Sequence, residues 1–161
     1  MAPLAAAAAL YLAAAIQTSV ASRLAIGPAV PDFVLILVIC IGLLRGPTAG
    51  TWAGFGGGLF FGLLQPRAEA LAGLTIGTML AGLLAGRQRR WLRVEHWLAV
   101  PISALGLTLV ASAVTWLLSQ PGQIGHGLKL GAAAAVYNAI LSPVIFALVR
   151  RADRRLRPRE D

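Results

Sequence analysis

Six apolar stretches that contain very few charged residues constrain the fold of this chain more than any other feature. Hydrophobic residue types make up 58% of the 161 residues and charged types 12%, which is about half of the roughly 25% that is usual in soluble domains. A water-soluble fold of this size cannot hide so much apolar surface, whereas a lipid bilayer solvates it. The stretches run approximately over residues 3–21, 28–44, 49–64, 70–85, 97–118 and 128–149.

Each stretch is predicted to be a helix, because a peptide group without a hydrogen bond is costly in lipid and a helix satisfies its own. The alternation between apolar and polar residues that marks the strands of a membrane barrel does not occur. Breakers such as Gln120-Pro121-Gly122 fall between the stretches. The expected fold class is an all-α polytopic membrane protein, a bundle of about six transmembrane helices over residues 1–150, with a basic cytoplasmic tail over residues 151–161.

The positions of the basic residues predict the orientation of the bundle. The net charge is +8, and short cytoplasmic loops of membrane proteins are enriched in Lys and Arg. If the N-terminus is inside, the cytoplasmic side holds Arg45 and the basic groups at 87–93 and 150–159, and the outer side holds only Arg23, Arg67 and Lys129. Both termini are therefore expected in the cytoplasm. Nucleic acid is not expected as a partner, because the basic residues form no face interleaved with aromatic side chains on a soluble module.

The sequence offers no constellation for catalysis or metal binding. His96 and His126 are far apart in the predicted topology, and Cys40 lies alone within an apolar stretch, so neither a metal site nor a nucleophile with its base can be proposed. Polar residues inside the stretches are interpreted as interhelical hydrogen-bonding groups. These residues are Gln17, Thr18, Ser19, Thr75, Thr78, Ser103, Thr108, Ser112, Thr115 and Asn138. We expect no enzymatic activity, no cofactor and no small-molecule substrate.

Small residues at helical spacing are the most specific physical feature. Gly50, Gly54, Gly58 and Gly62 are four residues apart, and Gly73, Gly77 and Ala81 continue the spacing in the next stretch. Residues four apart share one face of a helix, and small residues let two helix backbones approach closely in lipid. Two interpretations follow. The faces pack on each other within the bundle, which is favoured, or one of them is a docking groove for the transmembrane helix of another protein.

Two basic segments are candidates for contact with anionic lipid headgroups or with a cytoplasmic partner. Their residues are Arg87, Arg89, Arg90, Trp91 and Arg93 in the first, and Arg150, Arg151, Arg154 and Arg155 in the second. The alternative is that they only set the topology, with tryptophan at the membrane interface.

Three consecutive segments resemble the MreD family of rod shape-determining membrane proteins. They are the Pro31-Asp32 pair that opens PDFVLILVICIGLLRG, the glycine-rich GTWAGFGGGLFFGLL, and the small-residue segment GLTIGTMLAGLLAG. The resemblance covers about residues 10–90 in its motifs and the rest in topology and length. Where the family often has an Asp after the glycine-rich helix, this chain has Gln65.

The resemblance implies a non-enzymatic membrane scaffold of the bacterial cell-elongation machinery, located in the cytoplasmic (inner) membrane as a multi-pass protein. It implies binding to the bitopic membrane protein MreC and, through MreC, association with the MreB filament and the cell-wall synthase that makes lateral peptidoglycan. As a hypothesis, the helix of MreC docks on the face of Gly50, Gly54, Gly58 and Gly62 or on that of Gly73 and Gly77.

A substrate-binding membrane subunit of an energy-coupling-factor vitamin transporter is the alternative function. Ala5, Ala9 and Ala13 give the first stretch a small-residue face for contact with a transporter partner. The short outer loops, however, offer few polar groups that could converge on a vitamin.

Overall fold

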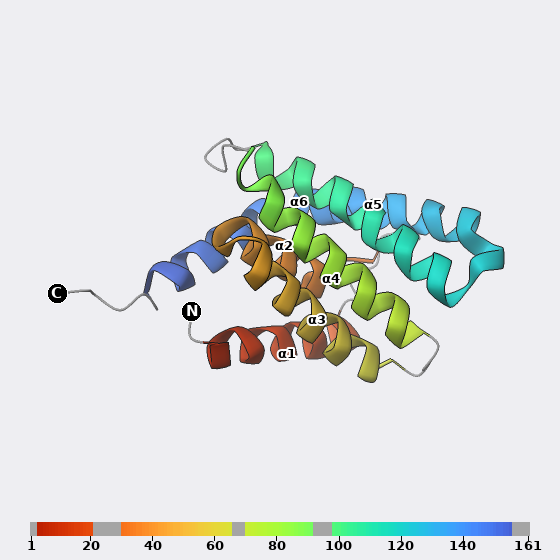
Figure 1. The fold of residues 1–161 in the computed structure, drawn as a ribbon, viewed down its shortest axis with the longest axis horizontal. Helices are drawn as coiled ribbons and strands as arrows, with labels where there is room; N and C mark the ends of the chain where they lie inside the picture. Colours follow the sequence, from red (N-terminus) through yellow and green to blue (C-terminus); the bar gives the residue numbers. More distant parts are fainter. Residues whose placement is uncertain (1–2, 21–29, 66–69, 92–97, 156–161) are drawn as a thin grey trace.

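The computed structural model describes residues 3–20, 30–65, 70–91 and 98–155. Within these ranges the chain forms six α-helices and one short 3-10 turn, η2 (Pro121–Gln123), so the all-α prediction is confirmed. The helices are α1 (Pro3–Val20), α2 (Phe33–Arg45), α3 (Pro47–Leu63), α4 (Ala70–Gln88), α5 (Ala99–Ser119) and α6 (Ile124–Arg155) (Figure 1). The predicted boundary between domain and tail at residue 150 lies inside α6, which continues as a helix to Arg155.

Three of the described helices, α4, α5 and α6, are long and apolar enough to cross a membrane. The apolar parts of α1 and α2 are shorter, at Ala6–Ser19 and Phe33–Arg45. With 13 residues, α2 measures about 20 Å at 1.5 Å per residue, which is less than the ~30 Å thickness of a hydrocarbon core. The lengths and compositions of α4, α5 and α6 are those of a membrane protein.

Helix α2 lies at the centre of the bundle. The other five helices form a curved row in the order α1, α3, α4, α5 and α6, each packed on the next, and α2 contacts all five (Figure 1). The helix is buried continuously from Val34 to Leu43. A helix that is apolar all round is typical of the interior of a bundle. Because the other five helices surround α2, it does not need the length of a helix that crosses the hydrocarbon core in contact with lipid.

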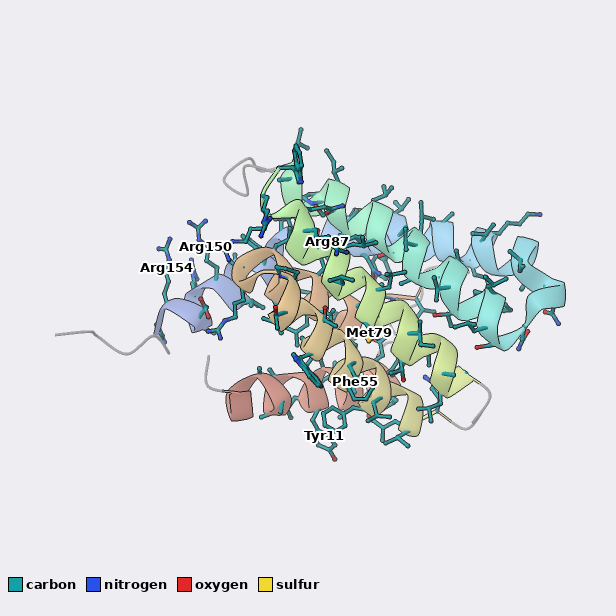
Figure 2. The ribbon with its side chains drawn as sticks, viewed as in Figure 1. Tyr11, Phe55, Met79, Arg87, Arg150 and Arg154 are labelled. Atoms are coloured by element: carbon teal, nitrogen blue, oxygen red, sulfur yellow. The ribbon has the colours of Figure 1, made fainter. Side chains whose placement is uncertain are left out.

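One end of the bundle holds most of the basic residues that the structure describes. The chain passes directly from the C-terminus of α2 into α3 at Gly46, and the C-terminal end of α4 lies beside the start of α3, because Gly86 is in contact with Pro47. Arg45, the last residue of α2, forms an ion pair with Asp153 near the end of α6. We call this the basic end. Arg87 of α4 and Arg150 and Arg154 of α6 are among the side chains drawn in Figure 2.

Candidate functional site

The predicted face of Gly50, Gly54, Gly58 and Gly62 is packed against α4 of the same chain, and we call this contact the glycine seam. A methyl group on Gly54 would lie 2.6 Å from the Cα atom of Met79, and one on Gly58 would lie 2.7 Å from the Cα atom of Thr75. These separations are far below a normal carbon–carbon contact of about 3.5–4.0 Å. The two backbones can therefore approach this closely only because the α3 positions lack a side chain.

The hydroxyl group of Thr78 fixes the seam at its middle. Its Oγ1 atom lies 2.7 Å from the carbonyl oxygen of Gly54 on α3 and 2.7 Å from that of Leu74 on its own helix. The single hydroxyl proton can be donated to either oxygen. Thr78 therefore links the two helices where they are closest, and its buried hydroxyl remains bonded to backbone.

The opposite side of α4 packs on α5 by the same means. A methyl group on Gly73 would lie 3.1 Å from the Cα atom of Thr115, and one on Gly77 would lie 2.8 Å from the carbonyl oxygen of Ala111. The Thr115 hydroxyl donates to the carbonyl oxygen of Gly73 at 3.1 Å. Ala81 is fully buried in the core. Helix α4 is thus held between α3 and α5 by small residues on both sides.

This arrangement corrects the hypothesis of a docking groove. Both small-residue faces that were candidates for a partner's helix, the α3 face and the Gly73 and Gly77 face, are covered by neighbouring helices of this chain. A helix from another protein could reach either face only if the bundle opened. The structure favours the interpretation that the small residues pack the bundle itself.

Pro31 and Asp32 lie at the start of α2, where side chains from three other helices converge. The Gln17 amide of α1 donates to the carbonyl oxygen of Pro31 at 2.9 Å and accepts from the N–H of Phe33 at 2.6 Å. The N–H of Asp32 donates to Oδ1 of Asn138 at 2.8 Å. We call Gln17, Asp32, Asn138 and Thr108 the polar cluster.

Asn138 extends the polar cluster from α6 to α5. Its Nδ2 atom donates to the Thr108 hydroxyl at 3.1 Å, and Asn138 and Thr108 are both almost completely buried. The Asp32 carboxylate caps α2 by accepting from the N–H of Leu35 at 2.9 Å, which stabilises a helix N-terminus. The cluster thus bonds the start of α2 directly to α1 and α6, and through Asn138 to α5.

The Arg45–Asp153 ion pair joins α2 to α6 at the basic end. The Nε atom of Arg45 lies 2.9 Å from Oδ1 of Asp153, and its Nη2 atom also contacts that oxygen. Asp153 is only 4% exposed. Sequence reasoning missed this pair, because Asp153 was assigned to the tail. The signal that could have revealed it is the position of Asp153, a carboxylate between the arginine pairs 150–151 and 154–155 that directly follow the last apolar stretch.

The other predicted basic residues line two exposed surfaces at the basic end. Arg87, Arg89, Arg90 and Trp91 are exposed at the end of α4, and Arg150, Arg151, Arg154 and Arg155 are exposed at the end of α6. Arg93 and the tail beyond Arg155 lie outside the described residues.

Each of these surfaces contains a hollow. The first lies between α3 and α4 and measures about 770 Å³. The second lies on α6 and measures about 280 Å³, with Phe146, Ala147, Arg150, Arg151 and Arg154 around it.

A third hollow of about 250 Å³ lies at the other end of the bundle, between α3, α4 and α5. Phe61 and Trp116 supply aromatic walls, and Gln65 and Ser119 supply polar groups. The buried Oγ atom of Ser119 has no hydrogen-bond partner among the described residues. This hollow combines apolar and polar groups as ligand sites do, but it is smaller than the roughly 300–1,000 Å³ of typical small-molecule pockets.

Within the described ranges, no group of three or more His, Cys, Asp or Glu side chains could hold a metal ion. A scan against protein-family models finds no match for the chain, and searches of curated proteins and of solved structures find none either. The functional proposal therefore depends on the sequence motifs and on the contacts described above.

Proposed function

We propose that the chain is a non-enzymatic scaffold of the bacterial cell-elongation machinery, an MreD-like protein with six helices in the inner membrane and both termini in the cytoplasm. Its partner in this proposal is MreC, through which it associates with the MreB filament and the cell-wall synthase. The observation that carries the proposal is the use of the buried polar groups. The buried Gln17 and Thr78 and the partly buried Thr115 bond to the backbone of a neighbouring helix, which is a way of holding a bundle together.

The family-like segments support the same proposal through their positions. The Pro31-Asp32 pair begins the central helix and is bonded to α1 and α6. The glycine-rich segment and the small-residue segment are the two sides of the glycine seam. The three segments that carry the resemblance to MreD thus make close contacts in the interior of the bundle. Such use of these segments is expected of a membrane scaffold that has no catalytic site.

The basic end supports the proposed orientation. Arg45, Arg87 and Arg150 belong to different helices and lie at helix ends that the antiparallel arrangement brings together. Positive charge is retained on the cytoplasmic side of membrane proteins. The end of α2, the start of α3 and the end of α4 lie together there, and Arg45 pairs with Asp153 near the end of α6. This grouping supports a cytoplasmic C-terminus in the proposal.

Recovery of partners from native membranes tests the proposal. A tagged full-length chain, extracted from its own cells with mild detergent, is expected to bring down MreC, and depletion of the chain is expected to turn rod-shaped cells round. The tagged variant Gly54→Leu disrupts the glycine seam and is expected to recover less MreC, whereas the control Gly56→Leu leaves the seam intact and is expected to recover as much as wild type. Rod-shaped cells after depletion, together with the absence of MreC from the wild-type sample, would contradict the proposal.

The hollow beside Ser119 is the observation that favours the second candidate, a solute-binding subunit of a vitamin transporter. Against this candidate, Ala9 and Ala13 pack against the core and do not form the free face that was expected to contact a transporter partner. Native mass spectrometry of the purified chain separates the two functions. One bound small molecule per chain would favour the transporter subunit, and its loss in Ser119→Leu would place it in this hollow.

A further inference from the structure

The hollow between the start of α3 and the end of α4 has the composition of an anion site, and we call it the basic groove. Its volume is about 770 Å³. Its walls are Pro47, Thr48, Thr51 and Trp52 of α3, Leu83 and Arg87 of α4, and Arg90 and Trp91 of the turn that follows α4. Two arginines therefore face a cavity whose described walls contain no acidic residue.

The backbone of α3 adds to this positive potential. The helix begins after Gly46, which adopts a positive φ of 96° and has no side chain to cap the helix. The first N–H groups of a helix have no acceptor within it, and they carry the positive end of the helix dipole. Pro47 has no N–H, and the N–H of Gly50 donates to the carbonyl oxygen of Gly46, so the N–H groups without an acceptor inside α3 are those of Thr48 and Ala49. The Thr51 hydroxyl already donates to the carbonyl oxygen of Pro47 at 2.8 Å, which leaves Thr48 as the hydroxyl donor of the groove.

The apolar walls point to a lipid as the source of the anion. Trp52 is 70% exposed and Trp91 is 88% exposed, and tryptophan is enriched where hydrocarbon meets headgroups. One turn further along α3, the exposed Phe55 packs edge-on against Trp52 with ring centroids 6.3 Å apart. A headgroup in the groove would therefore have an aromatic surface beside it on which an acyl chain can lie.

We propose that the basic groove binds the phosphate of an anionic phospholipid of the inner leaflet. Arg87 and Arg90 pair with the phosphate, since a guanidinium group matches phosphate geometry with two parallel hydrogen bonds. Thr48 and the first N–H groups of α3 bind its remaining oxygens, and Trp52 and Trp91 flank the glycerol region. This site deepens the proposed function, because it rests on the proposed orientation in the membrane, but it does not depend on MreC.

Lipid binding to the purified full-length chain tests the site. In native mass spectrometry, phosphatidylglycerol is titrated against wild type, against Arg87→Gln with Arg90→Gln, and against Arg150→Gln with Arg154→Gln. Both double variants remove two positive charges from exposed positions at the basic end, so their nonspecific electrostatic effects are matched. We expect the groove variant to weaken phosphatidylglycerol binding by about tenfold and the α6 variant to weaken it by less than about threefold.

Two ligand arms separate the sources of the phosphate. Phosphatidylcholine, which has a phosphate group but no net charge, is expected to bind more weakly than phosphatidylglycerol. Inorganic phosphate at millimolar concentration is expected not to displace the lipid. Equal losses in the two double variants, no preference between the lipids, or displacement by inorganic phosphate would each overturn the proposal. Thr48→Val provides a second variant that keeps every charge, and it is expected to weaken binding by about threefold.

The lipid experiment and the recovery of MreC test the two proposals separately, so one proposal can be contradicted while the other stands. Loss of lipid selectivity with MreC still recovered would remove the site and leave the scaffold function intact. Selective lipid binding without MreC would retain the site in a membrane protein of another function.

Discussion

From Val34 to Ile39, helix α2 packs in the bundle through large branched side chains, whereas α3 and α4 pack on each other through bare backbone. Ile36 and Ile39 of α2 are completely buried and fill the space between helices. In the glycine seam, Gly54 and Gly58 leave that space empty of side chains, and the backbone of α4 occupies it. Both regions are buried. In the first, side chains make the contact between helices, and in the second the backbones make it, because glycine has no side chain to separate them.

The two regions fix the relative positions of their helices in different ways. In lipid, acyl chains solvate apolar surface as well as another helix does, so apolar burial alone does not hold helices together. Branched apolar side chains gain little by exchanging acyl chains for another helix, so their burial alone does not fix the position of α2. Helix α2 is accordingly anchored at both ends, by the polar cluster and by the Arg45–Asp153 pair. In the glycine seam the two backbones are already in close contact, which limits how far one helix can shift along the other. A single interhelical hydrogen bond, from the Thr78 hydroxyl, lies at its middle.

The largest expected effect is on the glycine seam. Gly54→Leu forces a side chain into the backbone of Met79, so the free energy of unfolding in mixed micelles should fall by about 3 kcal/mol or more. The matched control is Gly56→Leu on the same helix, where no described atom lies within 4 Å of an added methyl group. We expect the control to change stability by less than about 0.5 kcal/mol. Equal stability of the two variants would show that α3 does not meet α4 through this face.

The next effect is at the anchored end of α2. Asn138→Leu keeps the approximate volume but leaves the N–H of Asp32 and the Thr108 hydroxyl without their partner. Loss of buried hydrogen bonds is expected to lower the free energy of unfolding by about 1–2 kcal/mol. Thr18→Val is the control, because that exposed hydroxyl donates to the carbonyl oxygen of Ala15 in its own helix. An unchanged unfolding curve for Asn138→Leu would mean that the polar cluster does not anchor α2.

Removal of one methyl group from the side-chain packing of α2 should have a smaller effect. Ile36→Val creates a small cavity and is expected to lower the free energy of unfolding by about 1 kcal/mol. Ile140→Val on α6 removes the same group from a side chain that is largely exposed and should be near neutral. If Ile36→Val were as damaging as Gly54→Leu, the contrast between the two regions would disappear.

The smallest effect is expected at the ion pair, because the Arg45 side chain is partly exposed. A double-mutant cycle with Arg45→Gln and Asp153→Asn isolates the pair from the other contacts of these residues. We expect a coupling free energy of about 0.5–1 kcal/mol that decreases in high salt. A coupling of zero would show that α2 is anchored at one end only.

The helical character of the chain could be predicted from its sequence because apolar length and the need to satisfy backbone hydrogen bonds decide it. The spacing of Gly50, Gly54, Gly58 and Gly62 likewise predicted a close helix contact. It could not identify the partner, because a bare face of this kind fits a helix from the same chain or from another. Only the arrangement in space shows that α4 occupies it.

The polar cluster could be predicted only as separate residues. Gln17 and Asn138 were recognised as interhelical hydrogen-bonding groups, but their convergence on the start of α2 depends on the order of helices around it. That order is decided by packing between distant segments, which periodicity within one segment does not encode. The Arg45–Asp153 pair was missed because the tail was expected to begin before Asp153, and because a separation of 108 residues hides the contact from a pattern within one segment.

A double-mutant cycle at Gly62 and Leu71 tests the glycine seam most directly. One substitution adds a methyl group to the contact at Gly62, and the other removes the Leu71 atoms that this group would meet. A methyl group on Gly62 would lie 2.6 Å from the Leu71 Cδ1 atom, and shortening Leu71 removes that atom. We predict that Gly62→Ala destabilises the wild-type background but has a clearly smaller effect beside Leu71→Ala, with a coupling free energy of about 1 kcal/mol. Additive effects, within about 0.3–0.5 kcal/mol, would contradict the claim that the glycine face of α3 packs closely against α4.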